Sequence, residues 1–513
     1  MSESRREQAH QRPFDANALR HVHFVAIGGT GMGSLAGLVK ARGLLVTGSD
    51  KKLYPPMSTA LEEWGIEVVE GFAAENVLAR RPDLVVIGNA VRPDNEEAIA
   101  AIESGLPFRS FSDALYELAI ATKHCITVSG THGKTTTTNL MAHLLLATGR
   151  DPSLLVGGIS LDFDGSFREG AGDHFVVEGD EYDTAFFDKT PKFLHYHPDT
   201  LILTSVEFDH ADIYRDLDHV KSAFRDLVRS MPADGRIVAA WSHAGVRDVA
   251  RDAACEVIGY GVERAEQGDA PEGARWWASN LTPVGSVLRF DLEDRESGRR
   301  FEIESALFGA HNVENIVGVL AALDAEGIPL EEAIPALRVH RGVKRRQEIR
   351  GQAAGVTVID DFAHHPTAVA GTIEAIAQQK CADSDRGADA AEGRIVALLE
   401  PRTNTSRRAL FQDDYIRALE GADRIAIAEV GDEPIYSATG EVTECLSAEA
   451  VASALRDRGR DAIALAEVDA IVDWVVDGRQ PGDTVLVMSN GAFGGIWEKL
   501  LTALGNAGAE SDR

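Results

Sequence analysis

The sequence predicts an α/β protein of three domains, of which the first and third are Rossmann-like and the central one contains a mixed sheet. Two observations lead to this prediction. The chain has 513 residues, which is more than a single hydrophobic core usually supports. Three successive stretches each open with a run of apolar residues that leads into a glycine turn or a helical segment, as parallel strands do.

The N-terminal domain is expected over residues 21–120, after a flexible tail at 1–20, with strands over 21–29, 44–50 and 83–91. The central domain, 121–340, is expected to contain strands at 123–130, 174–183 and 200–210, antiparallel strands between 236 and 304, and a helix at 310–325. The C-terminal domain, 341–505, shows strand patterns at 356–361, 394–401, 424–430 and 484–490. Its polar, alanine-rich stretch at 380–393 is expected to be an exposed loop.

Charge and composition argue against several classes of function. Lysine and arginine number 51 against 81 acidic residues, and the net charge of −30 argues against a general binder of nucleic acid or of an anionic membrane. No apolar run is long enough to span a membrane, and the polar N-terminus lacks the apolar core of a signal peptide. Four cysteines without paired spacing indicate neither disulfides nor a zinc site. We therefore expect a cytoplasmic protein that acts on small molecules, and no obligate protein partner is evident.

A first glycine loop, GGTGMGS at 28–34, follows the first strand and opens a helix, and Asp50 ends the next strand. This arrangement presents backbone N–H groups and a helix N-terminus to a diphosphate. The dinucleotide fingerprint needs glycines at i, i+2 and i+5, and it is broken in both possible registers, by Ser34 in one and by Thr30 in the other. The loop therefore predicts the diphosphate of some nucleotide, bound by Gly28, Gly29, Thr30, Gly31, Met32, Gly33 and Asp50.

A second loop, SGTHGKTTTTN at 129–139, joins a strand to a helix and contains Gly-Lys-Thr. The usual phosphate loop, G-x-x-x-x-G-K-[ST], requires a glycine where Val128 stands, so this loop is shorter than usual. Lys134 can reach the β and γ phosphates of ATP, Thr135 can offer its hydroxyl to Mg²⁺, and the loop N–H groups can hold phosphate oxygens. The predicted ATP-binding residues of this P-loop ATPase-like domain are Gly130, Thr131, Gly133, Lys134, Thr135 and Thr136.

Acidic residues follow the next two strands of the central domain. The first strand end carries Glu178, Asp180, Glu181 and Asp183, and the second carries Glu207, Asp209, His210 and Asp212. A single acidic strand end usually terminates a strand or caps a helix. Phosphoryl transfer needs metal ions held by carboxylates, so two such ends behind one lysine loop predict a metal site. Further along, GAHNVEN at 309–315 places Asn312 at a helix start, where its amide could read an adenine.

Together these motifs resemble the Mur ligase family, ATP-dependent enzymes that form amide bonds in cell-wall precursors. The family's phosphate loop is the shorter G-T-x-G-K-[ST], which residues 130–135 match at every position. The resemblance covers nearly the whole chain in order, through IGGTGMGS, the lysine loop, EGDE, EFDH, GAHNVEN, KRR at 344–346 and DDFAHHPT at 360–367. It implies ATP and Mg²⁺ as cofactors, and it puts Arg346 and Asp361 near the nucleotide.

Within the family, the first glycine loop and HHP at 364–366 resemble members that extend UDP-N-acetylmuramate. The stretches at 179–196, 362–368 and 400–408 look like those of the branch that recycles murein tripeptide. This resemblance implies joining UDP-N-acetylmuramate to L-alanyl-γ-D-glutamyl-meso-diaminopimelate through an acyl phosphate. Lys134, Glu178 and His210 are then expected to be catalytic, with one Mg²⁺ on Thr135 and a second on Glu178 and His210. Arg225 stands where several members carry a carbamylated lysine, so no carbamylation is expected.

The peptide is expected at the C-terminal ends of strands in the third domain, where open α/β sheets bind ligands. Arg402, Asn404, Ser489 and Asn490 lie at such ends. A peptide with several carboxylates needs an arginine fork. The competing interpretation is that Arg402 is a surface arginine paired with an acid.

Three other functions stay open at this point. A ligase that adds free L-alanine to the same muramate would share the mechanism. A nicotinamide-dependent oxidoreductase could use GGTGMGS, but it would leave the lysine loop unexplained. An ATP-binding regulatory module without turnover would have no need for the near-complete set of phosphate and metal residues.

Overall fold

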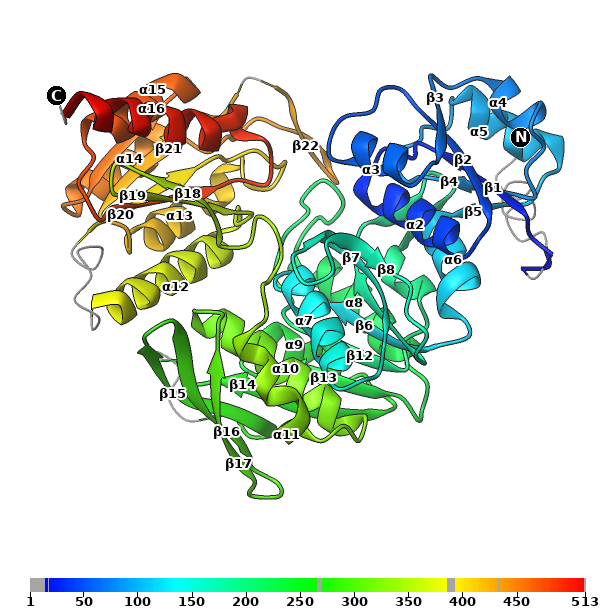
Figure 1. Cartoon of the computed structure of the whole chain (residues 1–513), viewed down its shortest axis with the longest axis horizontal. Coiled ribbons are helices and arrows are strands. Elements are labelled where there is room, and N and C mark those ends of the chain that lie inside the picture. The colour runs from blue at the N-terminus through cyan, green and yellow to red at the C-terminus, as the bar shows by residue number, and fades with distance from the viewer. Residues whose placement is uncertain (1–13, 17, 265–269, 385–392, 432, 512–513) are drawn as a thin grey trace. The chain divides into compact units, whose positions relative to one another are not determined.

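The computed structural model describes residues 14–511 except 17, 265–269, 385–392 and 432. Within these residues the chain forms three β-sheets of five or more strands, and many consecutive strands of a sheet are connected by helices (Figure 1). This architecture confirms the predicted three-domain α/β fold. Most of the tail predicted at 1–20 lies outside the described residues. The loop predicted at 380–393 begins too early, because helix α12 (Pro366–Ser384) continues to Ser384, and 385–392 are not described. No described helix is both long and apolar enough to cross a membrane.

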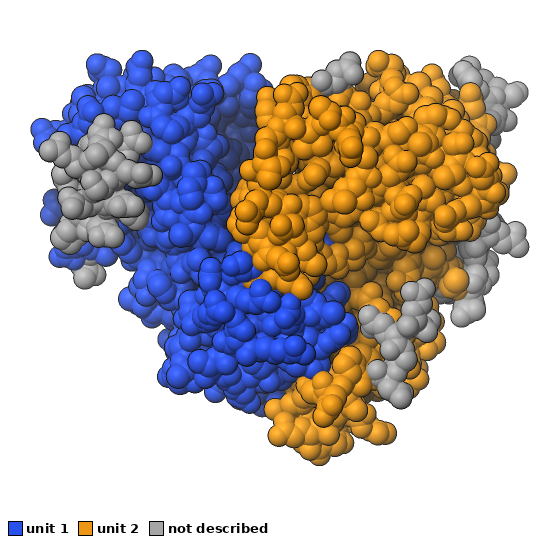
Figure 2. All heavy atoms as spheres, turned by 180° about the vertical axis from the view of Figure 1, so that it is seen from behind, with its two compact units in different colours: residues 1–205, 222–259, 318–336 blue, residues 206–221, 260–317, 337–513 orange. Residues whose placement is uncertain are grey.

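By compactness the chain divides into two units (Figure 2). Unit 1 contains residues 1–205, 222–259 and 318–336, and unit 2 contains residues 206–221, 260–317 and 337–513. Strand β14 (Glu256–Val262), helix α8 (Leu217–Ser230) and helix α10 (Ala310–Ala325) each have residues in both units. The acidic stretch that follows β12 therefore belongs to a different unit from the lysine loop.

The N-terminal sheet is entirely parallel and has the order β3-β2-β1-β4-β5. Its elements are β1 (His21–Val25), α2 (Thr30–Ala41), β2 (Leu45–Asp50), α3 (Met57–Glu63), β3 (Glu67–Glu70), α4 (Ala74–Leu78), β4 (Leu84–Ile87), α5 (Glu96–Ser104), β5 (Phe108–Ser110), α6 (Phe111–Leu115) and η1 (Tyr116–Ile120). Val22, Phe24 and Val86 pack in one buried cluster with α2 and α6, whereas Val85 and Ile87 pack in another with α5. Helices thus cover both faces, as in a doubly wound fold.

The central sheet has the order β17-β16-β15-β14-β13-β12-β6-β9-β7-β8. In unit 1, β6 (His124–Ser129) lies between β9 (His174–Gly179) and β12 (Thr200–Leu203) and is parallel to both. The remaining elements of unit 1 are α7 (Lys134–Ala147), β7 (Ser153–Ser160), β8 (Gly165–Arg168), β10 (Asp183–Ala185), β11 (Asp188–Pro191), η2 (Lys192–His195), β13 (Arg236–Ala240), α9 (Ala244–Ala250), α11 (Leu330–Ala333) and most of η3 (Ile334–Arg338). Helix α10 coincides with the helix predicted at 310–325.

One prediction for the central sheet is wrong. Strand β13 was included in the antiparallel stretch, but it pairs parallel to β12, because helix α8 crosses over between them and restores the chain direction. Antiparallel pairing is found among β15 (Ala274–Val284), β16 (Val287–Asp294) and β17 (Arg300–Ser305) of unit 2, which are joined by short turns.

The C-terminal sheet, in unit 2, has the order β18-β19-β25-β20-β21-β24, in which only β18 is antiparallel to its neighbour. Its elements are β18 (Glu348–Ala353), β19 (Val356–Asp361), α12, β20 (Ile395–Leu399), η5 (Ala409–Phe411), α13 (Gln412–Leu419), β21 (Arg424–Ala428), β22 (Ile435–Ser437), β23 (Gly440–Val442), α14 (Ala448–Asp457), β24 (Asp461–Leu465), α15 (Val468–Asp477), β25 (Thr484–Met488), η6 (Phe493–Gly495) and α16 (Ile496–Ser511). Ala397 and Leu399 pack with α12 and α13, and Val396 and Leu398 pack with α15 and α16. Burial on both faces explains why β20 is apolar throughout.

Candidate active site

The lysine loop leaves the C-terminal end of β6 and opens helix α7. Gly130 (φ 139°) and Gly133 (φ 81°) both have positive φ, which residues with side chains rarely adopt. A Cβ atom on Gly130 would also lie 2.7 Å from the backbone nitrogen of Ser205. Thr204 donates from Oγ1 to the carbonyl oxygen of His132 (2.6 Å), and the His132 N–H donates to Ser205 Oγ (2.8 Å). The end of β12 therefore holds the shortened loop, and it does so through the backbone of His132.

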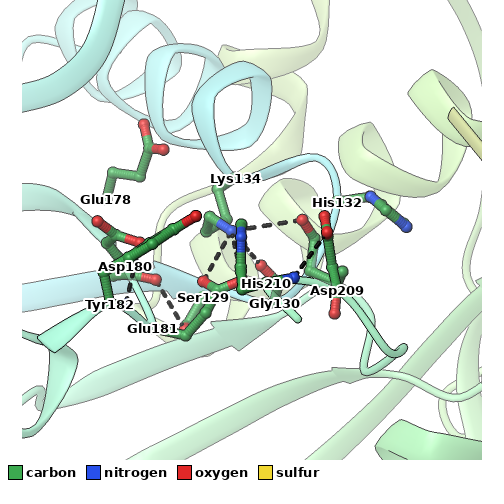
Figure 3. A network of polar contacts seen from close by, with 12 residues as sticks. Ser129, Gly130, His132, Lys134, Glu178, Asp180, Glu181, Tyr182, Asp209 and His210 are labelled. Atoms are coloured by element: carbon green, nitrogen blue, oxygen red, sulfur yellow. Dashed lines mark hydrogen bonds and ion pairs between the residues drawn. The ribbon is translucent and has the colours of Figure 1, made fainter. Parts of the chain in front are cut away.

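Lys134 is the first residue of α7, and its side chain returns to the loop (Figure 3). Its Nζ donates to the carbonyl oxygen of Gly130 (2.7 Å) and to Glu181 Oε2 (2.8 Å), with side chains 12% and 2% exposed for Lys134 and Glu181. Burial disfavours the charged ammonium, but the carboxylates of Glu181 and Asp180 outweigh it and raise the pKa of Lys134. Lys134 therefore carries a positive charge beside the lysine loop. The sequence offers Glu181 only as one of four acids at and after the end of β9, and no motif singles it out as the partner of Lys134.

Thr135 and Glu178 bring a hydroxyl and a carboxylate together beside the loop. Thr135 Oγ1 donates to Glu178 Oε1 (3.2 Å), and the Gly157 N–H donates to Glu178 Oε2 (2.9 Å). Oxygen ligands of this kind suit Mg²⁺. Asp180, by contrast, forms an ion pair with Lys192 (2.5 Å). Glu178 is therefore the acid of this strand end that lies against the loop threonine.

The first turn of α7 adds backbone donors to these side chains. Lys134, Thr135 and Thr136 are its first three residues, and N–H groups at this position of a helix have no intrahelical partner. They lie at the positive end of the helix dipole, which attracts anions. Thr131 is buried, and its N–H donates to the carbonyl oxygen of Ser205 (3.0 Å).

His210, the other predicted metal ligand, belongs to unit 2. Its backbone has a φ of 53°, and its N–H donates to Asp209 Oδ1 (2.7 Å). The next residue, Ala211, is held by a hydrogen bond to Thr405 Oγ1 (2.9 Å). Because Glu178 lies in unit 1, a metal ion shared by Glu178 and His210 stays a proposal.

The predicted nucleotide residues of unit 2 occupy two places. Asn312 is buried at the start of α10, where its Nδ2 donates to a backbone carbonyl of the preceding turn (2.8 Å). Asp361 ends β19 and accepts from the N–H groups of Gln347 (2.8 Å) and Ala363 (2.7 Å). Burial raises the pKa of Asp361, and the guanidinium of Arg346 opposes that shift. The charges of Arg346 and Asp361 therefore interact. The side chain of Asn312, in contrast, is hydrogen-bonded within the turn that starts its own helix.

The first glycine loop is closed by Asp50. Its Oδ2 accepts from the N–H of Gly28 (2.7 Å), which links the ends of β1 and β2. Helix α2 begins at Thr30 after Gly29, and no side chain caps it, so its N–H groups suit a diphosphate. The side chain of Met32 packs in the core, which leaves its backbone as the part that a ligand could meet.

The predicted peptide residues follow the C-terminal ends of β20 and β25. Ser489 is buried and donates from Oγ to Glu400, and Asn404 Oδ1 accepts from a backbone N–H of β22 (3.4 Å). Asn490 Oδ1 is buried without a hydrogen-bond partner among the described residues. Arg402 is exposed, and across the described ranges of the chain its guanidinium forms no ion pair. The interpretation of Arg402 as an ordinary paired surface arginine is therefore not supported.

Arg225 lies in α8, and its guanidinium donates to Asp248 (3.1 Å). Asp248 belongs to α9, the helix that follows β13, so the arginine at this position forms an ion pair with that helix. The prediction that no carbamylated lysine is present stays a prediction.

Fold and site together define a class of protein: an ATP-dependent ligase of the Mur type, with a glycine loop after the first strand, a shortened lysine loop and a third α/β sheet. Three family models match consecutive parts of the chain. They are the Mur ligase family catalytic domain at 21–123, the Mur ligase middle domain at 128–323 and the Mur ligase glutamate ligase domain at 345–491. The chain belongs to the Mur ligase family, and it is an ATP-dependent ligase that forms a C–N bond.

Two individual relatives and one solved structure are similar to nearly the whole chain. The chain is 39% identical over 483 residues to UDP-N-acetylmuramate–L-alanyl-γ-D-glutamyl-meso-2,6-diaminoheptandioate ligase of Escherichia coli (strain K12), over 94% of this chain and 98% of the relative. The ligase of the same name from Haemophilus influenzae is 36% identical over 486 residues, 95% and 99% of the two chains. Among solved structures, the murein peptide ligase of Psychrobacter arcticus 273-4 matches with a TM-score of 0.66 at 33% identity, over 95% of this chain and 99% of the other.

Proposed function

We propose that this ligase joins UDP-N-acetylmuramate to the murein tripeptide L-alanyl-γ-D-glutamyl-meso-diaminopimelate, with ATP as the energy source, in the recycling of cell-wall peptides. The observation that carries the proposal is the convergence of Lys134, Thr135 and Glu178 on one loop. The acceptor is supported by the two relatives at 39% and 36% identity and by the exposed Arg402. Because ATP and UDP-sugars are cytoplasmic, the cytoplasm is the proposed location.

The first chemical step is attack by the muramate carboxylate on the γ-phosphate of ATP. Both groups are anions, so the site must supply positive charge, and Lys134 remains charged in its surroundings. The step forms a bond between a carboxylate oxygen and the γ-phosphorus and breaks the bond between that phosphorus and the bridging oxygen, which leaves with ADP. The neutral amine of the peptide then attacks the carbonyl carbon of the acyl phosphate and forms a C–N bond. The C–O bond to phosphate breaks, the nitrogen loses one proton to solvent, and the amide and inorganic phosphate are released.

The residues beside the loop fit Mg²⁺. Thr135 Oγ1 and Glu178 Oε1 lie 3.2 Å apart, and hydroxyl and carboxylate oxygens are the donors that this ion prefers. Thr135 would hold one Mg²⁺, and Glu178 with His210 would hold a second. When bound, these ions supply positive charge that offsets the charge on the γ-phosphate and the substrate carboxylate.

The substrates are assigned to the remaining predicted residues. The glycine loop at 28–33 and Asp50 would bind the diphosphate of UDP-N-acetylmuramate, because α2 offers its uncapped N-terminus there. Asn312, Arg346 and Asp361 would contact the nucleotide of ATP. Arg402 and Asn404, with Ser489 and Asn490, would bind the peptide, whose carboxylates suit an arginine.

A product assay tests the proposal. Purified protein is given ATP, Mg²⁺ and UDP-N-acetylmuramate with the tripeptide, with L-alanine or with no acceptor. The tripeptide adduct is expected, and Lys134→Ala should abolish it. A ligase for L-alanine is the second candidate, because a relative with that activity in its name is 30% identical over 489 residues. Product from L-alanine alone would establish that candidate instead.

Isotope transfer tests the acyl phosphate. With oxygen-18 in the muramate carboxylate, one labelled oxygen should appear in the released phosphate for each amide formed. Unlabelled phosphate would exclude this intermediate.

A further inference from the structure

Gly491 lies three residues beyond β25, the last strand of the C-terminal sheet in chain order, and directly beside Arg402. A Cβ atom placed on Gly491 would overlap Nη1 of Arg402 and would lie 2.6 Å from its Cζ and 2.7 Å from its Cδ. Real Cβ atoms essentially never approach other heavy atoms to within 3.0 Å. The side chain of Arg402 therefore occupies the space in which any other residue at 491 would place its own side chain.

The backbone does not require a glycine at this position. Gly494 (φ 58°) and Gly495 (φ 70°), a few residues further on, have left-handed φ values that favour glycine, whereas Gly491 is not among the residues with positive φ. The φ of Gly491 therefore gives no reason for a glycine at this position. The structural reason for a glycine here is thus the room that it leaves for Arg402.

The turn under Arg402 is held in place by side chains. Arg345 donates from Nη2 to the carbonyl oxygens of Ser489 and Gly491, at 2.7 Å each. The Gly491 N–H donates to Ser489 Oγ (2.9 Å), and that hydroxyl donates in turn to Glu400. The carbonyls of Ser489 and Gly491 and the N–H of Gly491 are therefore all engaged, and these hydrogen bonds hold the turn in place beside the arginine.

The backbone of Arg402 is fixed as well. Its N–H donates to Ser406 Oγ (3.0 Å), which also accepts from the Thr403 N–H (2.9 Å), and Ser406 is only 2% exposed. With this stretch of main chain held by Ser406, the side chain of Arg402 lies against Gly491. A preordered arginine loses less conformational entropy when it binds an anion.

The charge of Arg402 is available to a ligand. The chain carries 81 acidic against 51 basic residues, yet no carboxylate among its described residues pairs with Arg402. The neighbouring Arg345, in contrast, lies 3.3 Å from Asp360. A guanidinium in a fixed orientation matches the two oxygens of a carboxylate.

We propose that Gly491 is a positioning residue: the missing side chain seats the Arg402 guanidinium over the turn at 489–491, in the orientation that binds a carboxylate of the acceptor peptide. This inference rests on the proposed peptide ligase activity and extends it to a residue that does not touch the substrate. Substituting Gly491 should displace the end of a flexible side chain and leave the backbone in place.

Kinetics of Gly491→Ala test the proposal, together with Arg402→Ala and the double variant. The KM for the tripeptide is expected to rise about 10–100-fold in Gly491→Ala, the range that corresponds to losing a charged hydrogen bond. The KM for ATP should change less than about twofold. In the Arg402→Ala background the glycine substitution should add nothing, because the side chain that it displaces is already absent.

Gly505→Ala is the matched control, since Gly505 lies in α16 and nothing stands within 4 Å of an added Cβ. A tripeptide with amidated carboxylates gives a second readout. The wild type should prefer the acid over the amide, and Gly491→Ala and Arg402→Ala should both lose that preference. If Gly491→Ala is unstable, the double variant should regain melting temperature, because the overlap is relieved.

An unchanged tripeptide KM in Gly491→Ala would overturn the inference, as would independent, additive effects in the double variant or equal destabilisation of the single and double variants. Each of these outcomes presupposes that the wild type ligates the tripeptide. Failure of the wild type to do so would instead overturn the proposed function.

Discussion

Nζ of Lys134 lies 2.8 Å from Oε2 of Glu181, and the two side chains are 12% and 2% exposed. Charges so little exposed have lost most of their water, so each depends on the other for stabilisation. The ammonium that is proposed to meet the γ-phosphate of ATP is thus also the partner of a carboxylate. This relationship makes Glu181 a residue through which the charge of the loop can be tested.

Glu181→Gln keeps the shape of the side chain and removes its charge. We expect the free energy of unfolding to fall by about 3 kcal/mol, because the buried ammonium of Lys134 loses its partner. ATP should then raise the melting temperature more than in the wild type, because its phosphates supply the missing negative charge. Thermal melts with and without ATP measure both effects. Glu332→Gln, which loses a more exposed pair with Arg150 (3.2 Å), is the control, and equal ATP shifts in Glu181→Gln and wild type would contradict the prediction.

Glu178→Gln should change the requirement for Mg²⁺. Because Glu178 lies against Thr135, losing its charge should raise the Mg²⁺ concentration for half-maximal rate by about 10–100-fold. The rate is measured across a Mg²⁺ titration at saturating ATP. Glu169→Gln, which removes a pair with Arg42 (3.0 Å) away from the loop, should titrate like the wild type. An unshifted midpoint in Glu178→Gln would rule out its role as a metal ligand.

Arg402→Ala should weaken binding of the peptide and leave binding of the nucleotide unchanged. The KM for the tripeptide is expected to rise about 10–100-fold, while the KM for ATP stays within about twofold, because the lost bond is to a carboxylate of the acceptor. Steady-state kinetics with each substrate varied in turn separate the two values. Arg417→Ala removes an exposed arginine that already pairs with Asp414, and it should leave both values unchanged. Equal increases for tripeptide and ATP would count against the assignment.

His124 makes stability depend on pH. It starts β6 and lies 3.0 Å from Glu326 just after α10; this hydrogen bond raises the pKa of His124 above its ordinary 6.5. A histidine with a raised folded-state pKa contributes stability that is fully present below pH 6.5 and is lost as pH rises through the folded value. We expect His124→Gln to be less stable than the wild type at pH 6 by at most about 1 kcal/mol.

Melting curves of both proteins at a series of pH values measure this contribution. The difference in melting temperature between wild type and His124→Gln should become smaller as the pH is raised above 6.5. Glu326→Gln should show the same narrowing, since it removes the other half of the pair. A difference that stays constant from acid to alkaline pH would refute the assignment.

Local patterns located several elements to the residue. Strand β19 and helix α10 begin and end where the sequence predicts, because runs of apolar residues bounded by polar or glycine positions define them locally. The strand predicted at 200–210 ends at Leu203 instead, because the chain past that point leaves the sheet to hold the lysine loop. The direction of β13 could not be predicted either, since parallel pairing depends on which strand lies beside it.

The sequence by itself determined the fold class, the shortened lysine loop and the membership in the Mur ligase family. These features depend on residue types in a local order: strand, glycine with positive φ, lysine, helix. Only the tertiary structure decided that Glu178 meets Thr135 while Glu181 meets Lys134, that Asp50 accepts from Gly28, and that Arg402 lies over Gly491. The physical reason is that such contacts join strand ends far apart in the chain, and the order of strands in a sheet, which no local pattern specifies, brings them together.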